Sequence, residues 1–140
     1  MIQPIFTLIA ISAAFLTSNA LLGYDHTYSV GYGAFTLMAA MVSLTFLWLW
    51  ARRATPLAMG MFFGWSGAAA IMGWWWFYNL LGKPDRMADN PTLFLLLSIY
   101  FVGAILHFKV IATSFGVKGR SYLVPVAASL LGSVLVKFMI

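Results

Sequence analysis

The longest uncharged stretch of the chain includes Pro56 to Leu81, and the only ionisable side chain between these two residues is Tyr78. This is longer than the ~20 residues that a helix needs to cross the hydrocarbon core of a bilayer. Thr55 offers an N-cap oxygen, the proline at the first position suits a helix start, and Gly82 signals the end. The aromatic block Trp74–Tyr78 is typical of the headgroup boundary. The stretch therefore predicts a membrane-spanning helix.

The composition agrees with a lipid environment. Hydrophobic residues make up 63% of the chain and charged residues 8%, whereas a soluble domain has about 25% charged residues. The net charge of +5 rests on eight Lys and Arg residues that are scattered over short loops and helix ends without forming a basic face, so we expect no nucleic-acid partner. The chain has no cysteine, which excludes disulfides and thiolate chemistry. We expect its main partner to be the lipid bilayer.

Besides Pro56–Leu81, four other apolar runs are long enough to span a membrane. We expect an all-α, polytopic integral membrane helix bundle of about five helices, in which residues 1–140 form a single transmembrane domain. The run nearest the N-terminus, residues 4–23, lacks a preceding Lys or Arg, so we expect it to be retained rather than cleaved as a signal peptide. Residues 24–33 contain Gly31 and Gly33, which predict a helix-breaking loop, and Ser121 is a candidate N-cap for the last span. The predicted spans are 4–23, 34–51, 56–81, 91–115 and 121–139.

Small residues repeat at helical spacing in two of the spans. Gly60, Gly64 and Ala68 recur every four residues in the third span, so they lie on one face and allow another helix to approach closely. Ala128 and Gly132 repeat this spacing in the fifth span. We therefore expect the third and fifth spans to form the tightest helix–helix contact.

Basic residues are divided unequally between the two ends of the predicted spans. The end that holds the N-terminus has four basic residues against three at the other end, and five if Lys109 extends along its helix to reach that surface. The excess of Lys and Arg predicts a cytoplasmic N-terminus and an external C-terminus, in a bacterial inner or plasma membrane. The residues on the N-terminal side are Arg52, Arg53, Lys109, Lys118 and Arg120, and those on the other side are Lys83, Arg86 and Lys137.

His107 is the leading candidate for a ligand-binding residue. Gly103 lies one turn before it and Tyr100 two turns before it, on the same helix face. A histidine preceded by a small residue at this spacing can ligate the metal of a flat tetrapyrrole, because the missing side chain leaves room for the ring. The favoured alternative is a histidine that hydrogen-bonds a neighbouring helix or a lipid phosphate; a proton relay is the third possibility. Lys109 is a candidate anion-binding or proton-carrying charge, although a lysine near a helix end more often extends to the headgroups.

A second set of polar residues lies at the predicted outer face. Carboxylates and an imidazole can together hold a divalent cation. However, two loops that contribute four polar residues do not match a metal-site spacing, and Lys83 and Arg86 lie among them. We therefore expect local ion pairing and solvation, and no metal. The residues of this outer-face cluster are Asp25, His26, Asp85 and Asp89.

No catalytic motif stands out, and no span has a carboxylate near its centre. These features favour a non-catalytic subunit or accessory component of a membrane assembly, either a homo-oligomer or a partner of other membrane subunits. The first alternative is an oligomeric small transporter or channel for a neutral or lipid-like solute, because five short helices enclose little volume alone. The second alternative is a lipid-modifying or tetrapyrrole-binding membrane protein that uses His107. The sequence favours a protein that is not an enzyme, and it does not identify a cofactor.

Overall fold

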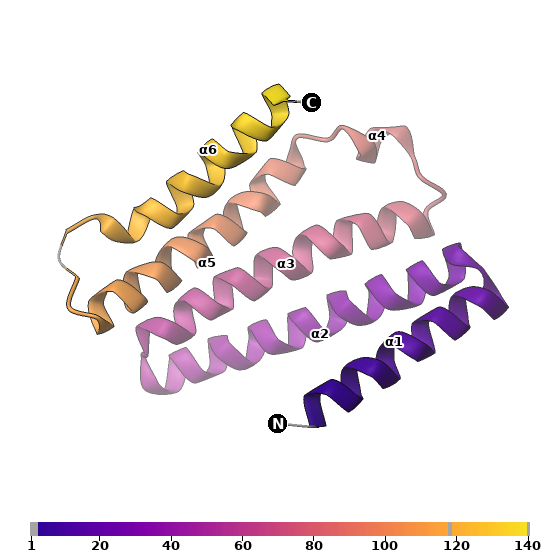
Figure 1. The fold of residues 1–140 in the computed structure, drawn as a ribbon, viewed down its shortest axis with the longest axis horizontal. Coiled ribbons are helices and arrows are strands. Elements are labelled where there is room, and N and C mark those ends of the chain that lie inside the picture. Colours follow the sequence, from indigo (N-terminus) through magenta and orange to yellow (C-terminus); the bar gives the residue numbers. More distant parts are fainter. Residues whose placement is uncertain (1–2, 118, 140) are drawn as a thin grey trace.

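The computed structural model of the protein describes residues 3–117 and 119–139, and this part of the chain is all-α (Figure 1). Five of its helical segments are long and apolar enough to cross a membrane, which confirms the predicted fold class. Lys118, one of the residues in the orientation count, lies outside the described residues. The elements are α1 (Gln3–Leu22), α2 (Tyr24–Arg53), α3 (Pro56–Leu80), the short α4 (Asp85–Ala88), α5 (Thr92–Ser114), the 3-10 turn η1 (Ser121–Leu123) and α6 (Val124–Met139).

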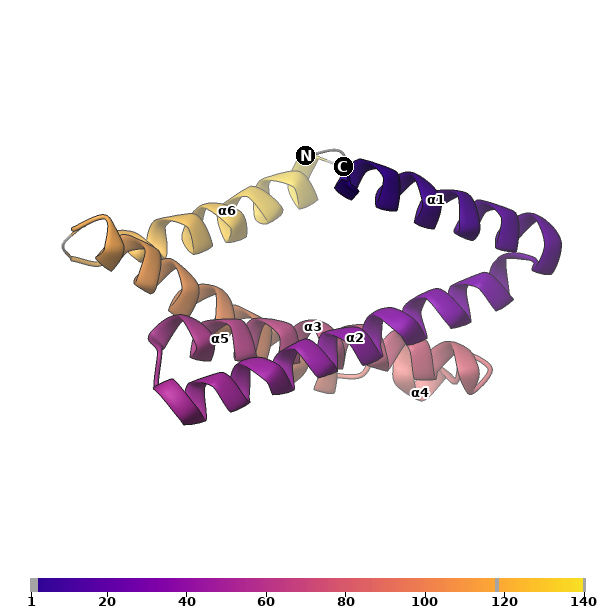
Figure 2. The same cartoon turned by 90° about the horizontal axis from the view of Figure 1, so that it is seen from below.

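Three helices form a central layer, and two outer helices leave it. In the layer, α3 packs between α2 and α5, as Figure 1 shows. The outer helix α1 folds back beside α2, and α6 folds back beside α5. Figure 2 shows that both outer helices diverge from the layer on the same side. Neither α1 nor α6 contains a buried residue, so the core of the described chain lies in the α2–α3–α5 layer.

A pair of serine hydroxyls joins α2 to α3. Ser43 is only 4% exposed. Its hydroxyl donates to the Phe62 carbonyl oxygen at 3.2 Å and lies 2.6 Å from Ser66 Oγ. Hydrogen bonds between membrane helices contribute about 0.6 kcal/mol on average. The other residues that are buried in these two helices are small as well, among them Ala39 of α2 and Ala58 of α3.

The contact between α3 and α5 is a backbone-to-backbone crossing. A Cβ added at Gly103 would overlap the backbone of Gly64, and one added at Gly67 would lie 2.5 Å from the Tyr100 nitrogen. A Cβ at Gly60 would come within 3.1 Å of the His107 nitrogen. The small residues of α3 therefore do allow close approach, and the helix that uses this space is α5.

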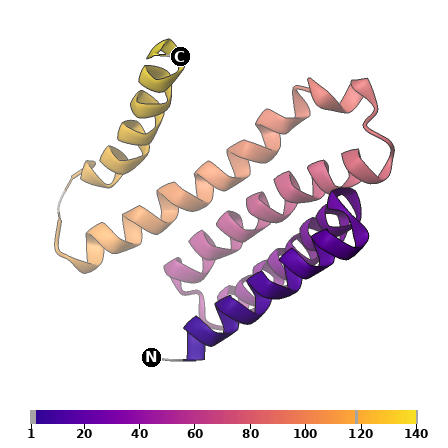
Figure 3. The same ribbon diagram turned by 45° about the vertical axis from the view of Figure 1, so that its right-hand side comes forward.

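The prediction that the third and fifth spans make the tightest contact is wrong. In the described chain, α3 packs extensively with α2 and α5, whereas the main neighbours of α6 are α5 and η1. Figure 3 shows α5 standing between α3 and α6. A Cβ at Gly132 would meet no atom within 4 Å. Small-residue spacing predicts that a helix can be approached closely, but it does not identify the partner helix. The glycine that meets the small face of α3 is Gly103 of α5.

The predicted loop at 24–33 is also wrong, because α2 begins at Tyr24. Gly31 and Gly33 lie inside this helix and receive aromatic rings from its neighbours. A Cβ at Gly31 would lie 3.0 Å from the Phe15 ring, and one at Gly33 would lie 2.7 Å from the Trp76 ring. Both glycines are therefore helix–helix contact points. The turn itself is made by Gly23, whose φ of 83° favours glycine.

The start of the last span also differs from the prediction. Ser121 opens the 3-10 turn η1, and the α-helix begins three residues later, at Val124. No side-chain cap hydrogen bond is found at the start of η1. The N-cap predicted at Ser121 is therefore not formed.

Candidate functional site

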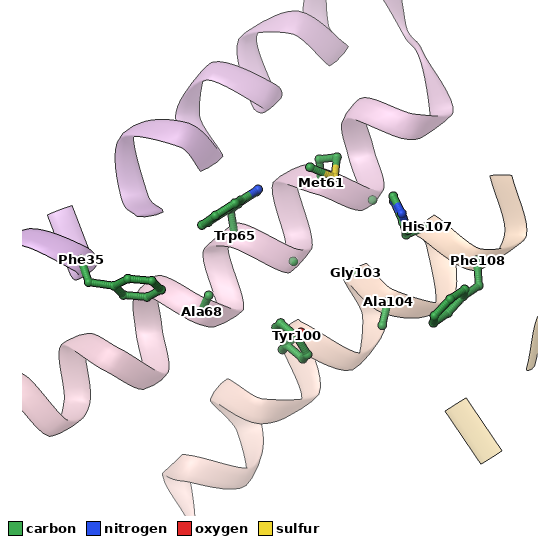
Figure 4. Close-up of a pocket in the computed structure, with 11 residues that line it drawn as sticks. Phe35, Met61, Trp65, Ala68, Tyr100, Gly103, Ala104, His107 and Phe108 are labelled. Carbon is green, nitrogen blue, oxygen red and sulfur yellow. The ribbon is translucent and has the colours of Figure 1, made fainter. Parts of the chain in front are cut away.

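A cavity of about 450 Å³ lies on one face of the central layer, and we call it the His107 cavity (Figure 4). Its walls are aromatic or long apolar side chains, joined by a single imidazole. Its floor is made of glycine and alanine positions on α3 and α5. The walls are Phe35, Met61, Trp65, Tyr100, His107 and Phe108, and the floor is Gly60, Gly64, Ala68, Gly103 and Ala104.

Helical periodicity places these side chains together. On α3, Met61, Trp65 and Ala68 are separated by four and three residues, so they follow one face of the helix. On α5, Tyr100, Ala104 and His107 have the same spacing. The glycines between them bring the two backbones close, and the bulky residues then stand around the space above the crossing. The small-residue pattern that predicted helix packing therefore also forms the floor of a cavity.

His107 is the only ionisable side chain of the cavity besides Tyr100. Its Nδ1 atom is buried and has no hydrogen-bond partner among the described residues. The ring lies edge-on to Phe108, with centroids 6.3 Å apart. An unsatisfied buried polar atom costs about 1–3 kcal/mol. The hydrogen bond to a neighbouring helix that the sequence favoured is thus not formed in the described part of the chain.

Gly103 has a different role from the one expected beside a tetrapyrrole. The sequence predicted that its missing side chain would leave room for a flat ring. In the structure, the backbone of Gly64 occupies that space. Gly103 therefore serves the crossing of α3 and α5, and the cavity that it lines with Tyr100 and His107 lies beside this crossing (Figure 4).

The fourth predicted ligand residue, Lys109, is separate from this cavity. Its side chain is exposed, and it lines another hollow of about 510 Å³ together with Trp50 and Met59. The structure therefore brings Tyr100, Gly103 and His107 to one cavity and leaves Lys109 outside it.

The outer-face cluster does not form a metal site. Asp25 and His26 lie in the first turn of α2, while Asp85 begins α4 and Asp89 follows it. Within residues 3–117 and 119–139, no group of three or more His, Asp or Glu residues is close enough to hold a metal ion.

A second cavity, which the sequence did not predict, lies between α1 and α2 on the same side of the layer. Its volume is about 690 Å³, and we call it the tyrosine cavity because Tyr24, Tyr28 and Tyr32 line it. The rings of Tyr28 and Tyr32 stack with centroids 4.0 Å apart. Phe35 lines both cavities. The four-residue spacing of the tyrosines was a usable signal, but it indicates a shared face only once residues 24–33 are known to be helical.

Fold and site together define an integral membrane protein: an all-α helix bundle with apolar cavities on one face of its central layer. Comparisons with protein-family models, with curated proteins and with solved structures found no match to this chain.

Proposed function

We propose that this protein is a non-catalytic component of a membrane assembly, joined to further copies of itself or to other membrane subunits through α1 and α6. The observation that carries the proposal is the exposure of these two helices. Neither buries a residue within the described chain, and both diverge from the central layer (Figure 2). Membrane helices associate by close packing against a partner, and the protomer leaves most of both helices free for such packing.

The small-residue face of α6 supports this role. Ala128 is exposed, and a Cβ at Gly132 would meet no atom within 4 Å. The hydroxyls of Ser129 and Ser133 donate to carbonyl oxygens of their own helix, each at 2.8 Å, so they add little polarity to the surface. A smooth face with small residues four positions apart is typical of a helix that packs against another helix.

We further propose that the N-terminus lies in the cytoplasm of a bacterial inner or plasma membrane and that the C-terminus lies outside. The last turn of α2 carries Arg52 and Arg53, which supports a cytoplasmic location for the connection between α2 and α3. The Arg52 guanidinium lies 5.9 Å from the centroid of the Trp48 ring, an arrangement suited to the headgroup region. Reporter fusions at the C-terminus test the orientation. An active cytoplasmic reporter at that end would contradict it.

The assembly role is tested by the native mass of the tagged protein in mild detergent. We expect either a multiple of 15.5 kDa or the added mass of other subunits. Gly132→Leu fills the small-residue face of α6 and should shift the mass toward that of the protomer. Ala127→Leu is the matched control, because it adds a similar side chain to another face of the same helix. A protomer mass for the unmodified protein would overturn the proposal.

A second candidate function is an oligomeric transporter or channel for a neutral or lipid-like solute. It is favoured by the two largely apolar cavities that meet at Phe35 on one side of the layer. Flux of uncharged solutes in reconstituted vesicles tests this role. The absence of flux above that of empty vesicles would count against it.

A further inference from the structure

The imidazole of His107 has hydrogen-bonding capacity that the protein does not use. Its Nδ1 atom is buried without a partner among the described residues. A neutral imidazole carries one donor and one acceptor nitrogen. With Nδ1 enclosed, Nε2 is the nitrogen through which the ring can contact a molecule in the cavity, and the tautomer protonated there donates a hydrogen bond. For this tautomer, the matching group on a ligand is an acceptor oxygen.

The walls of the His107 cavity restrict the rest of the ligand. Phe35, Trp65, Tyr100 and Phe108 present aromatic surface, and no Asp, Glu, Lys or Arg lines the cavity. Aromatic walls suit a planar ring in stacked or edge-on contact, and the absence of a formal counter-charge suits an uncharged molecule. The volume of about 450 Å³ lies within the roughly 300–1,000 Å³ of small-molecule sites.

The depth of His107 in the bilayer distinguishes glycerophospholipids from lipids that dissolve in the hydrocarbon core as candidate ligands. Gly103 is the middle residue of α5, so His107 lies about 6 Å from the centre of the helix at ~1.5 Å per residue. The hydrocarbon half-thickness of a bilayer is about 15 Å. The ester and phosphate groups of a glycerophospholipid would therefore lie roughly 9 Å further out. A ligand oxygen at the depth of His107 would therefore belong to a molecule dissolved in the hydrocarbon.

We infer that the His107 cavity binds an uncharged, ring-bearing lipid of the quinone type, whose carbonyl oxygen accepts a hydrogen bond from His107. Its apolar tail passes Phe35 into the tyrosine cavity, which Met72 also lines. Met61 and Met72 are eleven residues apart on α3, a rise of about 16 Å, which gives the tail a continuous face. The site does not depend on the assembly role, because α6 lines neither cavity.

The test is binding of tritiated decylubiquinone to the purified full-length protein in detergent, competed by unlabelled decylubiquinone. We expect saturable binding of one molecule per chain. His107→Phe should raise the Kd about tenfold, in the range that loss of one hydrogen bond produces, whereas His107→Gln keeps a donor and should stay within about threefold. Ala104→Trp should abolish saturable binding because it fills the cavity. The matched control is His26→Phe, which should leave the Kd unchanged, since His26 lies outside the cavity.

Three results would overturn the inference. They are binding without saturation, an unchanged Kd in either His107→Phe or Ala104→Trp, and equal competition by a phosphatidylcholine. Each variant is first checked for a single elution peak and for the helical circular dichroism of the unmodified protein. If His107→Phe fails this check, the decision rests on Ala104→Trp together with His107→Gln.

Discussion

The backbone of Gly64 in α3 lies where a side chain on Gly103 of α5 would have to stand. The relationship is not symmetrical, because a Cβ added at Gly64 would meet no atom within 4 Å. Gly64 turns its open side toward the His107 cavity, which it also lines. One pair of glycines thus sets the distance between two helices and leaves a hollow beside their crossing. An added methyl group should therefore have different effects at the two glycines.

Gly103→Ala should destabilise the protein by about 1–3 kcal/mol, the usual cost of overpacking. The added methyl group would meet backbone, which cannot move aside as a flexible side chain can. The measurement is thermal or denaturant unfolding in detergent, followed by circular dichroism. Gly64→Ala is the control and should unfold close to the unmodified protein. Equal destabilisation by the two substitutions would contradict the geometry of the crossing.

Gly33→Ala should also destabilise, because its methyl group would meet the Trp76 ring of α3 at 2.7 Å. Here the obstacle is a side chain, so a second substitution can relieve it. Trp76→Leu in the Gly33→Ala background should restore about half or more of the lost free energy of unfolding, a coupling typical of residues in contact. Additive losses in the double variant would show that the two residues do not meet.

Ser43→Ala should lower stability by roughly 0.6–1.7 kcal/mol, the range measured for hydrogen bonds between membrane helices. Its hydroxyl joins α2 to α3 through Ser66 and the Phe62 carbonyl. Thr45→Ala is the control, since the Thr45 hydroxyl donates to the Met41 carbonyl of its own helix at 2.8 Å. An effect of Thr45→Ala as large as that of Ser43→Ala would contradict the assigned interhelical bond.

Trp74→Phe should loosen the segment that contains α4. The Trp74 indole Nε1 donates to the Met87 carbonyl oxygen at 3.1 Å and holds this segment against α3. We expect faster hydrogen exchange in residues 83–90, with a loss of about 1 kcal/mol of local protection. Trp75→Phe is the control, because the Trp75 ring instead packs edge-on against Tyr78. Unchanged exchange in Trp74→Phe would contradict the role of the indole.

The sequence predicted the class of fold because apolar runs long enough for a bilayer leave a chain few alternatives. It did not predict the neighbours of each helix. Gly60 and Gly64 mark α3 as approachable in the same way that Gly132 marks α6, and only the tertiary arrangement decides which of these faces is used. Gly31 and Gly33 were misassigned for a related reason: in a membrane helix a glycine often receives a neighbouring side chain instead of ending the helix.

For the site, residue type and helical spacing placed Tyr100, Gly103 and His107 on one face, and the structure places all three at one cavity. The sequence could not reveal that the backbone of Gly64 fills the space beside Gly103. Nor could it assign Phe35 and Trp65, which come from two other helices, as walls of the same cavity. Contributions from separate helices depend on how the helices are packed, which periodicity within one helix does not encode.

The central claim, that α6 packs against another subunit, is tested most directly by cysteine cross-linking in native membranes. The chain has no cysteine of its own, so Gly132→Cys introduces a single reactive site. We expect a cross-linked band, at about 31 kDa if a second copy faces it or at another mass if a different subunit is captured by a thiol-to-amine reagent. Ala127→Cys, on another face of α6, should cross-link much less. A protomer band alone from Gly132→Cys, or equal cross-linking from both positions, would contradict the account.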